Sequence, residues 1–345
     1  NWESFQLNLP VVPITDMIVK EHNLIVATQG RSIWLIDDLS VIHQAKLGQD
    51  LKGNILFDPM DAYRMRGGQG RPSLTSGQNH PGGVSVNYYL GDLTDSSVVK
   101  LRFLDSEGNL IKEFASDEKD SMAKLKFDEG ANVLNWDMRY EGGKDFEGMV
   151  LWWASLQGPK AVPGTYQVEL EVDGAVQQKS FELINDPRVE ATQAELEAQF
   201  AFLQEVLQEV SDAHQAIIDI RSVRKQLNTY KSRIKDLEGT AAVVEQIDAI
   251  NKEMKGIEER LYQTKNRSRQ DPLNFPIRLT NKLAHLNSLV GGSDFAPTDQ
   301  AIAVKAELSA AVQTELDAFE QIKQDKIKAL NEAIRAASID AILVD

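Results

Sequence analysis

The sequence predicts a multidomain protein of the β plus α class, with short strands in its first half and long helices in its second half. Its 345 residues suit about two or three domains of ordinary size. Apolar residues alternate until about residue 190 and then recur at intervals of three and four, a period of about 3.5. We therefore expect a small β-sheet remnant over 1–51, a β-sandwich over 52–187, and an elongated antiparallel helical bundle or coiled coil over 188–345.

The first segment carries short runs rich in β-branched residues, which predict a three-strand meander. The runs cover residues 14–19, 24–28 and 32–36. Turn signals separate them at His22-Asn23 and at Gln29-Gly30. A propeller blade normally has four strands and is protected by its neighbours, so a three-strand remnant should expose a sheet edge and an apolar face. We expect this surface to pack on the next module or to pair with another chain.

The second segment shows the alternation of a half-buried sheet. One face of a strand is formed by Val84, Val86, Tyr88 and Leu90. Asp173-Gly174 is a strong hairpin signal, and Pro163-Gly164 opens another run of alternating residues. Several short strands at this spacing predict an immunoglobulin-like or fibronectin-like β-sandwich. Trp136 alternates with other apolar residues, so we expect it in the core.

Two features of this segment are candidate interaction sites. Trp152 and Trp153 are consecutive, and consecutive side chains of an extended strand point to opposite faces, so one of them should mark an interface. Residues 64–71 form a basic, glycine-rich island in an acidic chain, which could contact an anion or an acidic partner. The arginines of this island are Arg64, Arg66 and Arg71. A flexible loop without a ligand is the alternative interpretation, and the glycines favour it.

The third segment begins with a capping-box pattern, in which Glu195 follows Thr192 by three residues. An apolar seam continues from there to Leu237, and Gly239-Thr240 then gives a stop and a restart. The helices are expected over 192–238, 243–261, 277–290 and from 297 onward. Short connections favour antiparallel neighbours, so the sequence predicts an antiparallel bundle.

His214 occupies a position in this apolar seam. A buried imidazole needs a hydrogen-bond partner and can respond to pH, which makes His214 a candidate interaction residue. The alternative is an ordinary bundle histidine whose hydrogen bonds are satisfied. The five histidines of the chain have no ligand spacing, so no metal site is predicted.

Composition argues against several classes of partner. The 37 Lys and Arg residues against 52 Asp and Glu residues give a net charge of −15, which opposes binding to nucleic acid and to anionic membrane surfaces. No apolar run approaches the roughly 18 residues that a membrane-spanning helix needs. The chain has no cysteine, which excludes disulfides and thiol nucleophiles.

Motifs of enzymes are also missing. The sequence has no Walker loop, no Gly-x-Ser-x-Gly elbow and no His-Glu-x-x-His helix. The paired acids Asp37-Asp38 and Asp92/Asp95 fall at predicted turns, where aspartate favours local backbone hydrogen bonds. We therefore predict no catalytic, cofactor-binding or metal-binding residues and no cofactor, while the activity of any parent protein stays open.

An ordered series of short motifs carries a family resemblance. It comprises Asn8-Leu9-Pro10, Ile14-Thr15-Asp16, Ala27-Thr28-Gln29-Gly30-Arg31-Ser32, Trp34 and Asp37-Asp38-Leu39. This series resembles the last blade of bacterial sortilin-like β-propeller proteins, a group often labelled BNR-repeat glycosyl hydrolases. Later landmarks are Asn79-His80-Pro81-Gly82-Gly83, Asn135-Trp136-Asp137-Met138-Arg139-Tyr140, Pro163-Gly164-Thr165-Tyr166 and Asp186-Pro187-Arg188. The resemblance covers almost the whole chain, and its motifs are structural rather than catalytic.

The resemblance implies an N-terminal propeller outside this sequence, followed by an immunoglobulin-like module and a helical tail. It also implies an extracytoplasmic location, either periplasmic or secreted. We therefore expect a noncatalytic interaction or scaffold region of a larger propeller protein. The alternative is an accessory region of a secreted glycan or peptide hydrolase whose active site lies in the missing propeller. The expected partners are a protein or that propeller, with a homo-oligomer through the helical arm or the exposed blade edge as a further option.

Overall fold

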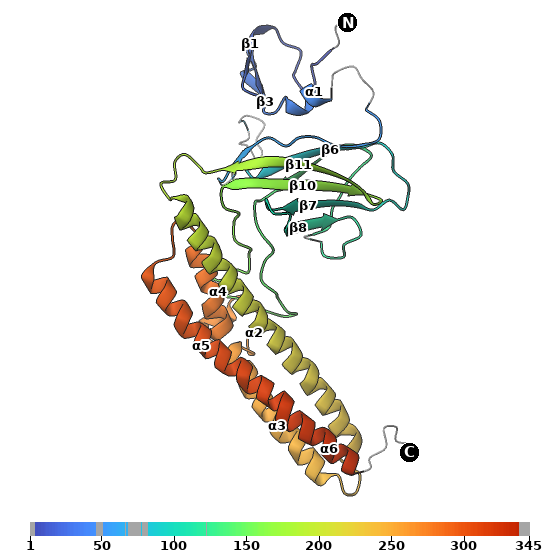
Figure 1. The fold of residues 1–345 in the computed structure, drawn as a ribbon, viewed down its shortest axis with the longest axis vertical. Helices are drawn as coiled ribbons and strands as arrows, with labels where there is room; N and C mark the ends of the chain where they lie inside the picture. The colour runs from blue at the N-terminus through green and yellow to red at the C-terminus, as the bar shows by residue number, and fades with distance from the viewer. Residues whose placement is uncertain are drawn as a thin grey trace. The chain divides into compact units, whose positions relative to one another are not determined.

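The computed structural model describes residues 4–45, 51–65, 67, 77, 82–121 and 123–337. It shows a mixed β and α protein, with several sheets followed by long helices (Figure 1). The chain divides into two compact units. Unit 1 combines Asn1–Arg139 with Ala161–Arg188, and unit 2 combines Tyr140–Lys160 with Val189–Asp345. The boundary expected at 187 lies close to the end of unit 1, but residues 140–160, which the sequence analysis placed in the β segment, cluster with the helices.

The first sheet of unit 1 is an antiparallel meander in the order β1-β2-β3, as the sequence predicts. Its strands are β1 (Ile14–Lys20), β2 (Asn23–Thr28) and β3 (Ile33–Ile36). The turn between β2 and β3 passes through Gly30 at a φ of 84°, a left-handed conformation that glycine adopts without steric cost. A short helix, α1 (Ser40–Gln44), follows the sheet.

Two further sheets make up the rest of unit 1. One is three-stranded and antiparallel, in the order β4 (Asn54–Leu56), β6 (Val84–Leu90) and β9 (Gly130–Trp136). The other is five-stranded, in the order β5 (Ala62–Tyr63), β11 (Ala175–Ile184), β10 (Gly164–Val172), β7 (Val99–Leu104) and β8 (Leu110–Ala115). Its strand pairs are antiparallel apart from the parallel pair of β5 with β11.

Aromatic side chains from these two sheets share one core. Trp136 of β9 is fully buried, which confirms the expectation from sequence. Its ring stacks on Phe103 of β7 at a centroid distance of 4.6 Å. It also meets Tyr166 of β10 and Phe181 of β11 edge-on. The Trp136 Nε1–H donates to the Arg139 carbonyl at 3.0 Å, so the polar atom of the indole is satisfied within the core.

The predicted strand patterns of unit 1 are confirmed in two places. The alternating apolar residues of β6 are all buried while those between them are partly exposed. β10 and β11 form a hairpin at Asp173-Gly174, where both residues have positive φ, 51° and 87°. Two consecutive positive φ angles are typical of a type I′ turn, which asparagine, aspartate and glycine favour. The Asp173 carboxylate accepts from Ser97 Oγ at 2.7 Å and from the Val98 N–H at 2.8 Å, and these bonds lower its pKa.

Unit 2 contains the long helices of the chain. They are α2 (Gln193–Ile234), α3 (Ala241–Leu261), α4 (Leu279–Val290), α5 (Asp299–Gln321) and α6 (Lys328–Ala336). A 3-10 turn, η1 (Asp271–Leu273), precedes α4, and a π-helical stretch, η2 (Ile322–Ile327), joins α5 to α6. The predicted capping box is present: Thr192 Oγ1 accepts from the Glu195 N–H, and the Glu195 carboxylate accepts from the Thr192 N–H at 2.8 Å.

The expectation that Leu237 continues the apolar seam of α2 is wrong. The helix ends at Ile234, and the Leu237 side chain is 40% exposed. The Thr240 hydroxyl lies 2.7 Å from the Ile234 carbonyl oxygen and 2.8 Å from that of Leu237, and its single hydrogen is shared between them. Ile234 is the last residue of the helix, so its carbonyl has no intrahelical partner and this contact supplies one.

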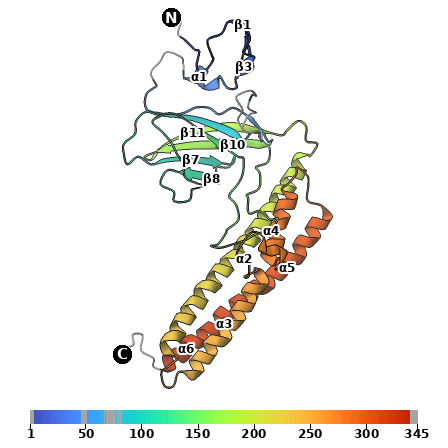
Figure 2. The same cartoon turned by 180° about the vertical axis from the view of Figure 1, so that it is seen from behind.

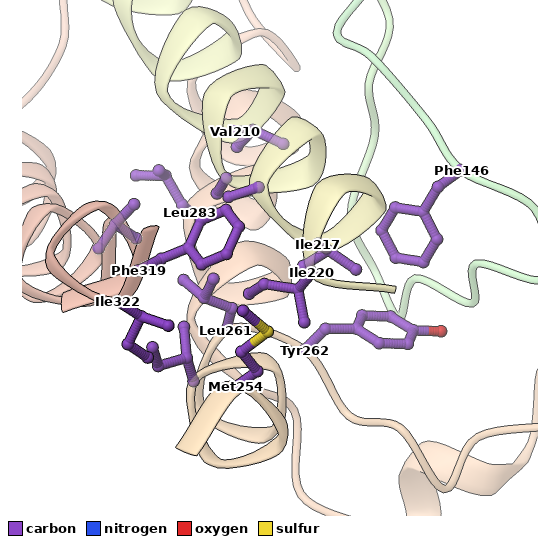
Figure 3. Close-up of a cluster of buried hydrophobic side chains, with 14 of the residues drawn as sticks. Phe146, Val210, Ile217, Ile220, Met254, Leu261, Tyr262, Leu283, Phe319 and Ile322 are labelled. Carbon is purple, nitrogen blue, oxygen red and sulfur yellow. The ribbon is translucent and has the colours of Figure 1, made fainter. Parts of the chain in front are cut away.

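The helices of unit 2 pack around one apolar cluster. α2 packs against α3, α4 and α5, and α3 packs against α5 and α6. Both cartoon views show α6 beside α3 near the C-terminal end of α2 (Figures 1 and 2). Within the cluster, Ile217 and Ile220 of α2 lie near Met254 and Leu261 of α3 (Figure 3). This packing gives α2 and α3 the fixed positions from which their polar side chains can meet.

Candidate functional site

The segment Tyr140–Lys160, here called the strap, crosses the helices of unit 2 without forming a helix or strand. Buried amides of α4 hold its backbone. Asn281 accepts from the Trp152 N–H at 2.7 Å and donates to the Trp152 carbonyl at 2.9 Å. Asn287 donates to the carbonyls of Ser155 at 2.9 Å and Gln157 at 3.0 Å. These side chains replace the backbone partners that an irregular segment lacks.

The strap changes the expectation for the two tryptophans. Trp152 and Trp153 are not consecutive residues of a strand, because Trp153 has a φ of 51°. Trp153 is 75% exposed, whereas Trp152 is half-buried, and their ring centroids are 6.4 Å apart. The Trp153 carbonyl accepts from His285 Nδ1 at 2.5 Å. The strap therefore fixes the backbone of both residues and leaves the Trp153 ring in solvent.

His214 of α2 is fully buried, as its seam position predicts, and it also binds the strap. Its Nδ1 donates to the Lys144 carbonyl at 2.5 Å, and its ring meets Phe146 edge-on at 5.0 Å. Its Nε2 has no hydrogen-bond partner among the described residues. Burial lowers the pKa of His214, and this effect exceeds the opposing effects of the Lys144 hydrogen bond and the Asp145 charge. The ring is therefore neutral at neutral pH.

One arginine of the basic island has a structural role. Arg64 is buried, and its Nε donates to the Ala161 carbonyl at 2.8 Å. Arg64 therefore joins two segments within unit 1, because a buried guanidinium group needs hydrogen-bond acceptors. The other two arginines of the island, Arg66 and Arg71, lie outside the described residues.

The β1–β3 sheet presents apolar residues on both of its faces. Every residue of β1 is exposed. On one face, Ile18 pairs with Ile25, which pairs with Leu35, and the outer two are 59% and 54% exposed. On the other face, Met17 pairs with Val26, which pairs with Trp34, and Met17 is 63% exposed. We call this the two-faced sheet. Continuous apolar runs are typical of strands that are covered on both sides.

A polar cleft of about 420 Å³ opens in unit 2 between the strap, α2 and α3. One of its lining residues is Glu258 of α3, which is buried. One carboxylate oxygen accepts from Arg221 Nε at 2.7 Å and the other from an Arg224 terminal nitrogen at 2.7 Å. Two arginines of α2 thus share a single carboxylate, and such charge-assisted bonds are short and strong.

Tyr262, just after α3, lines this cleft, and the Phe146 ring of the strap packs against the Tyr262 ring. The Arg221 guanidinium lies 4.7 Å from the centre of the Phe146 ring and 5.8 Å from that of Tyr262. The two rings meet edge-on at 4.9 Å, Phe146 from the strap and Tyr262 just after α3 (Figure 3). Tyr262 also accepts from the Val150 N–H at 2.8 Å through its hydroxyl oxygen. These contacts hold Arg221 in place, because stacked guanidinium groups are favourable over aromatic faces.

Two polar atoms of the cleft residues lack partners. The buried Nε of Arg224 and the buried Oδ1 of Asn266 have no hydrogen-bond partner among the described residues. The first is a cationic donor and the second an acceptor. Buried polar atoms without partners are uncommon and call for an explanation. Sequence reasoning missed this site; the three-residue spacing of Arg221 and Arg224 was its one local signal.

The structure adds two general findings. No helix in the described part of the chain is both long enough and apolar enough to cross a membrane. No group of three or more His, Cys, Asp or Glu side chains that could hold a metal ion occurs in the same part. In comparisons with known proteins, no family model matches the chain and no curated protein matches its sequence.

Proposed function

We propose that this chain is a noncatalytic interaction and scaffold region of a larger extracytoplasmic propeller protein. In this proposal, the two-faced sheet packs against neighbouring blades of the propeller. The observation that carries the proposal is the exposure of apolar side chains on both faces of β1–β3. The sequence motifs that resemble the last blade of sortilin-like propellers point to the same kind of partner.

The chemistry of the two-faced sheet defines what should cover it. β1 is an edge strand, so its outer backbone groups can pair with a further strand. Burial of one exposed side chain such as Ile18 contributes roughly 1.5–3 kcal/mol, and several such side chains lie on each face. A partner that supplies an edge strand and an apolar sheet on each side fits this surface, and blades of a propeller have these properties.

The other parts of the chain fit a scaffold within this proposal. We interpret the two sheets that share Trp136 as an immunoglobulin-like β-sandwich, which would position the propeller. We interpret the helices as an elongated antiparallel bundle, whose outer faces are available to a protein partner. The net charge of −15 supports protein rather than nucleic acid as that partner.

The proposal is tested on the native protein. An antibody raised against this chain should detect, in an extracytoplasmic fraction of the source cells, a species far larger than the 38.5 kDa of this sequence. Peptide mass spectrometry of that species should find propeller sequence in the same polypeptide. A 38.5 kDa species that is present from synthesis would contradict the proposal.

A second measurement tests the surface itself. Amide hydrogen exchange of Met17 should be slow in the large native species and fast in the purified chain, because its N–H, which donates to the Asp16 carboxylate at 2.9 Å, would instead pair with a partner strand. Ile18→Lys should weaken the association with the propeller, whereas Leu273→Lys, at an exposed apolar residue of unit 2, should leave it unchanged. Equal exchange in both species would overturn the assignment of this sheet as the contact.

A further inference from the structure

We propose that the connection between α3 and α4, here called the α3–α4 loop (residues 262–278), forms together with α4 a docking surface for an acidic segment of a partner protein. The surface belongs to unit 2 alone and is independent of the two-faced sheet. Three observations support it: a local reversal of charge, exposed cations without ion pairs, and an ordered loop that presents an exposed leucine.

The charge of this region is opposite to that of the chain. Residues 262–290 contain five Lys and Arg residues and a single acid, Asp271, whereas the whole chain has a net charge of −15. All five basic residues are exposed: they are Lys265, Arg267, Arg269, Arg278 and Lys282. A local cluster of one sign attracts and orients a partner of the opposite sign.

Four of these cations have no acidic partner. Those that make no ion pair within the described part of the chain are Lys265, Arg269, Arg278 and Lys282. Other cations of unit 2 do meet acids, for example Lys231 with Asp248 at 2.5 Å and Lys326 with Glu253 at 2.5 Å. The four unpaired cations therefore leave positive charge available to the acidic groups of another molecule.

The two arms of the α3–α4 loop lie side by side. The buried Gln263 donates through its amide to the Pro276 carbonyl at 2.9 Å. Beside this bond, Lys265 Nζ lies 5.6 Å from the centre of the Phe275 ring. Cations before the turn of the loop are thereby brought close to the start of α4, which carries the others.

The turn of the loop is fixed and exposes an apolar side chain. The Asp271 carboxylate accepts from the N–H groups of Arg267 at 2.5 Å and Ser268 at 2.8 Å, so the single acid of the region is committed to the loop itself. Leu273 ends the 3-10 turn η1 and is exposed. Irregular connections longer than roughly 12–15 residues are uncommon in compact domains, and those that are ordered usually have a function.

This combination favours a short acidic polypeptide over other polyanions. An apolar side chain of a peptide can cover Leu273, whereas a phosphate backbone gains nothing from that contact. A membrane surface or a nucleic acid extends beyond the loop and would meet the acidic remainder of the chain. A segment with acids on both sides of one apolar residue matches the loop alone.

Fluorescence anisotropy of a labelled peptide, Glu-Asp-Glu-Leu-Glu-Asp-Glu, with the full chain tests the proposal. We expect saturable binding of one peptide per chain, with an affinity that falls as salt is added. The same peptide with serine in place of leucine should bind at least about threefold more weakly. Absence of saturable binding would overturn the proposal. Tighter binding of phosphatidylserine vesicles or of oligouridylate would overturn the assignment to a protein.

Variants place the binding on this surface. The double variant Arg269→Gln with Arg278→Gln should weaken peptide binding at least about fivefold, because it removes two of the unpaired cations. The matched control, Lys225→Gln with Lys328→Gln, removes the same charge from exposed positions of α2 and α6. Its affinity should stay within about twofold of the unmodified chain. Equal losses in the two double variants would assign the effect to net charge and overturn the surface.

A thermodynamic cycle tests the apolar contact. Leu273→Ser should weaken binding of the leucine peptide and leave that of the serine peptide unchanged, because only the first pair buries apolar groups together. An equal loss for both peptides would overturn this contact. On the unmodified protein, amide NMR signals of residues 263–282 should shift on saturation with the leucine peptide, and unchanged signals there would contradict the docking surface whatever the variants do.

Sedimentation equilibrium distinguishes a partner protein from a second copy of this chain. The unmodified chain and the Arg269→Gln with Arg278→Gln variant should show the same mass at low and at physiological salt. A dimer that is lost in this variant and in high salt would assign the surface to self-association and overturn the proposal of a separate acidic partner.

Discussion

His214 shows how one buried side chain makes the stability of unit 2 depend on pH. Its Nδ1 is committed to the Lys144 carbonyl, and its Nε2 has no partner among the described residues. Protonation would place a charge in the core, next to the Phe146 ring and away from water. Burial therefore lowers the pKa of His214 from its ordinary value of 6.5.

The sign of the pH effect follows from this shift. Below pH 6.5 the unfolded chain binds a proton at His214 before the folded chain does, so the free energy of unfolding falls as the pH falls. The contribution is fully present above pH 6.5. Thermal melts between pH 5 and 8 should show a smaller pH dependence for His214→Asn than for the unmodified chain. An equal slope for the His214 variant and the unmodified chain would contradict this account.

Gly158 illustrates a different residue-scale constraint. A Cβ at this position would lie 1.9 Å from the Tyr140 carbonyl oxygen and 2.6 Å from that of Glu141. Both contacts are with backbone, so no side chain can move aside. Gly158→Ala should lower the free energy of unfolding by at least about 2 kcal/mol in urea titrations.

Gly256 provides the matched control for this prediction. It lies inside α3, where a Cβ would meet only the flexible end of Arg260, at 3.2 Å. Gly256→Ala should therefore raise stability by up to about 1 kcal/mol through helix propensity. Similar effects of the two substitutions would show that the close approach of Gly158 to Tyr140 does not control stability.

At the scale of elements, the strap is held by side chains rather than by regular structure. Asn281 is the clearest case, because it satisfies both the N–H and the carbonyl of Trp152. Its amide makes the two hydrogen bonds that a neighbouring strand would otherwise make with Trp152. Because Asn281 is buried, water can replace these bonds only after local opening of the structure. Residues of α4 thus decide the path of a segment that lies about 130 positions earlier in the chain.

Substitution of this amide tests the role of the strap. Asn281→Ala should cost about 1–3 kcal/mol, because it leaves two backbone groups of Trp152 without partners. Amide exchange at Trp152 and tryptic cleavage at Lys144 should both become faster. Lys282→Ala, at the next and exposed position of α4, serves as the control and should change neither rate. Unchanged exchange at Trp152 in the Asn281 variant would contradict the assigned role.

At the scale of the whole molecule, the two compact units do not follow the order of the sequence. The chain leaves unit 1 after Arg139, forms the strap of unit 2, and returns to unit 1 at Ala161. The core around Trp136 nevertheless draws its aromatic residues from unit 1 alone. We therefore expect unit 1 to retain its core when the helices are removed, while the strap loses its partners.

A fragment of residues 51–188 tests this division. It should show a cooperative thermal transition, since the Trp136 core is complete within it. Acrylamide should quench Trp152 and Trp153 and leave Trp136 shielded, because Trp136 is fully buried and the other two lose α4. The full chain should show stronger protection of Trp152. A fragment without a cooperative transition would contradict the independence of the unit 1 core.

The sequence by itself determined the features that depend on near neighbours. The three strands of the two-faced sheet, the Asp173-Gly174 hairpin, the Thr192 capping box and the core position of Trp136 were all predicted, because periodicity and turn chemistry act over a few residues. The apolar character of the two-faced sheet, which carries the proposed function, was predicted in the same way.

Tertiary structure alone decided which distant segments meet. It assigned the strap to the helices and gave Trp153 its left-handed conformation. It also joined Arg221 and Arg224 to Glu258, 37 and 34 residues further along the chain. Such contacts depend on how α2 and α3 pack. The sequence pattern of α2 does not specify which charged residue of α3 its arginines will face.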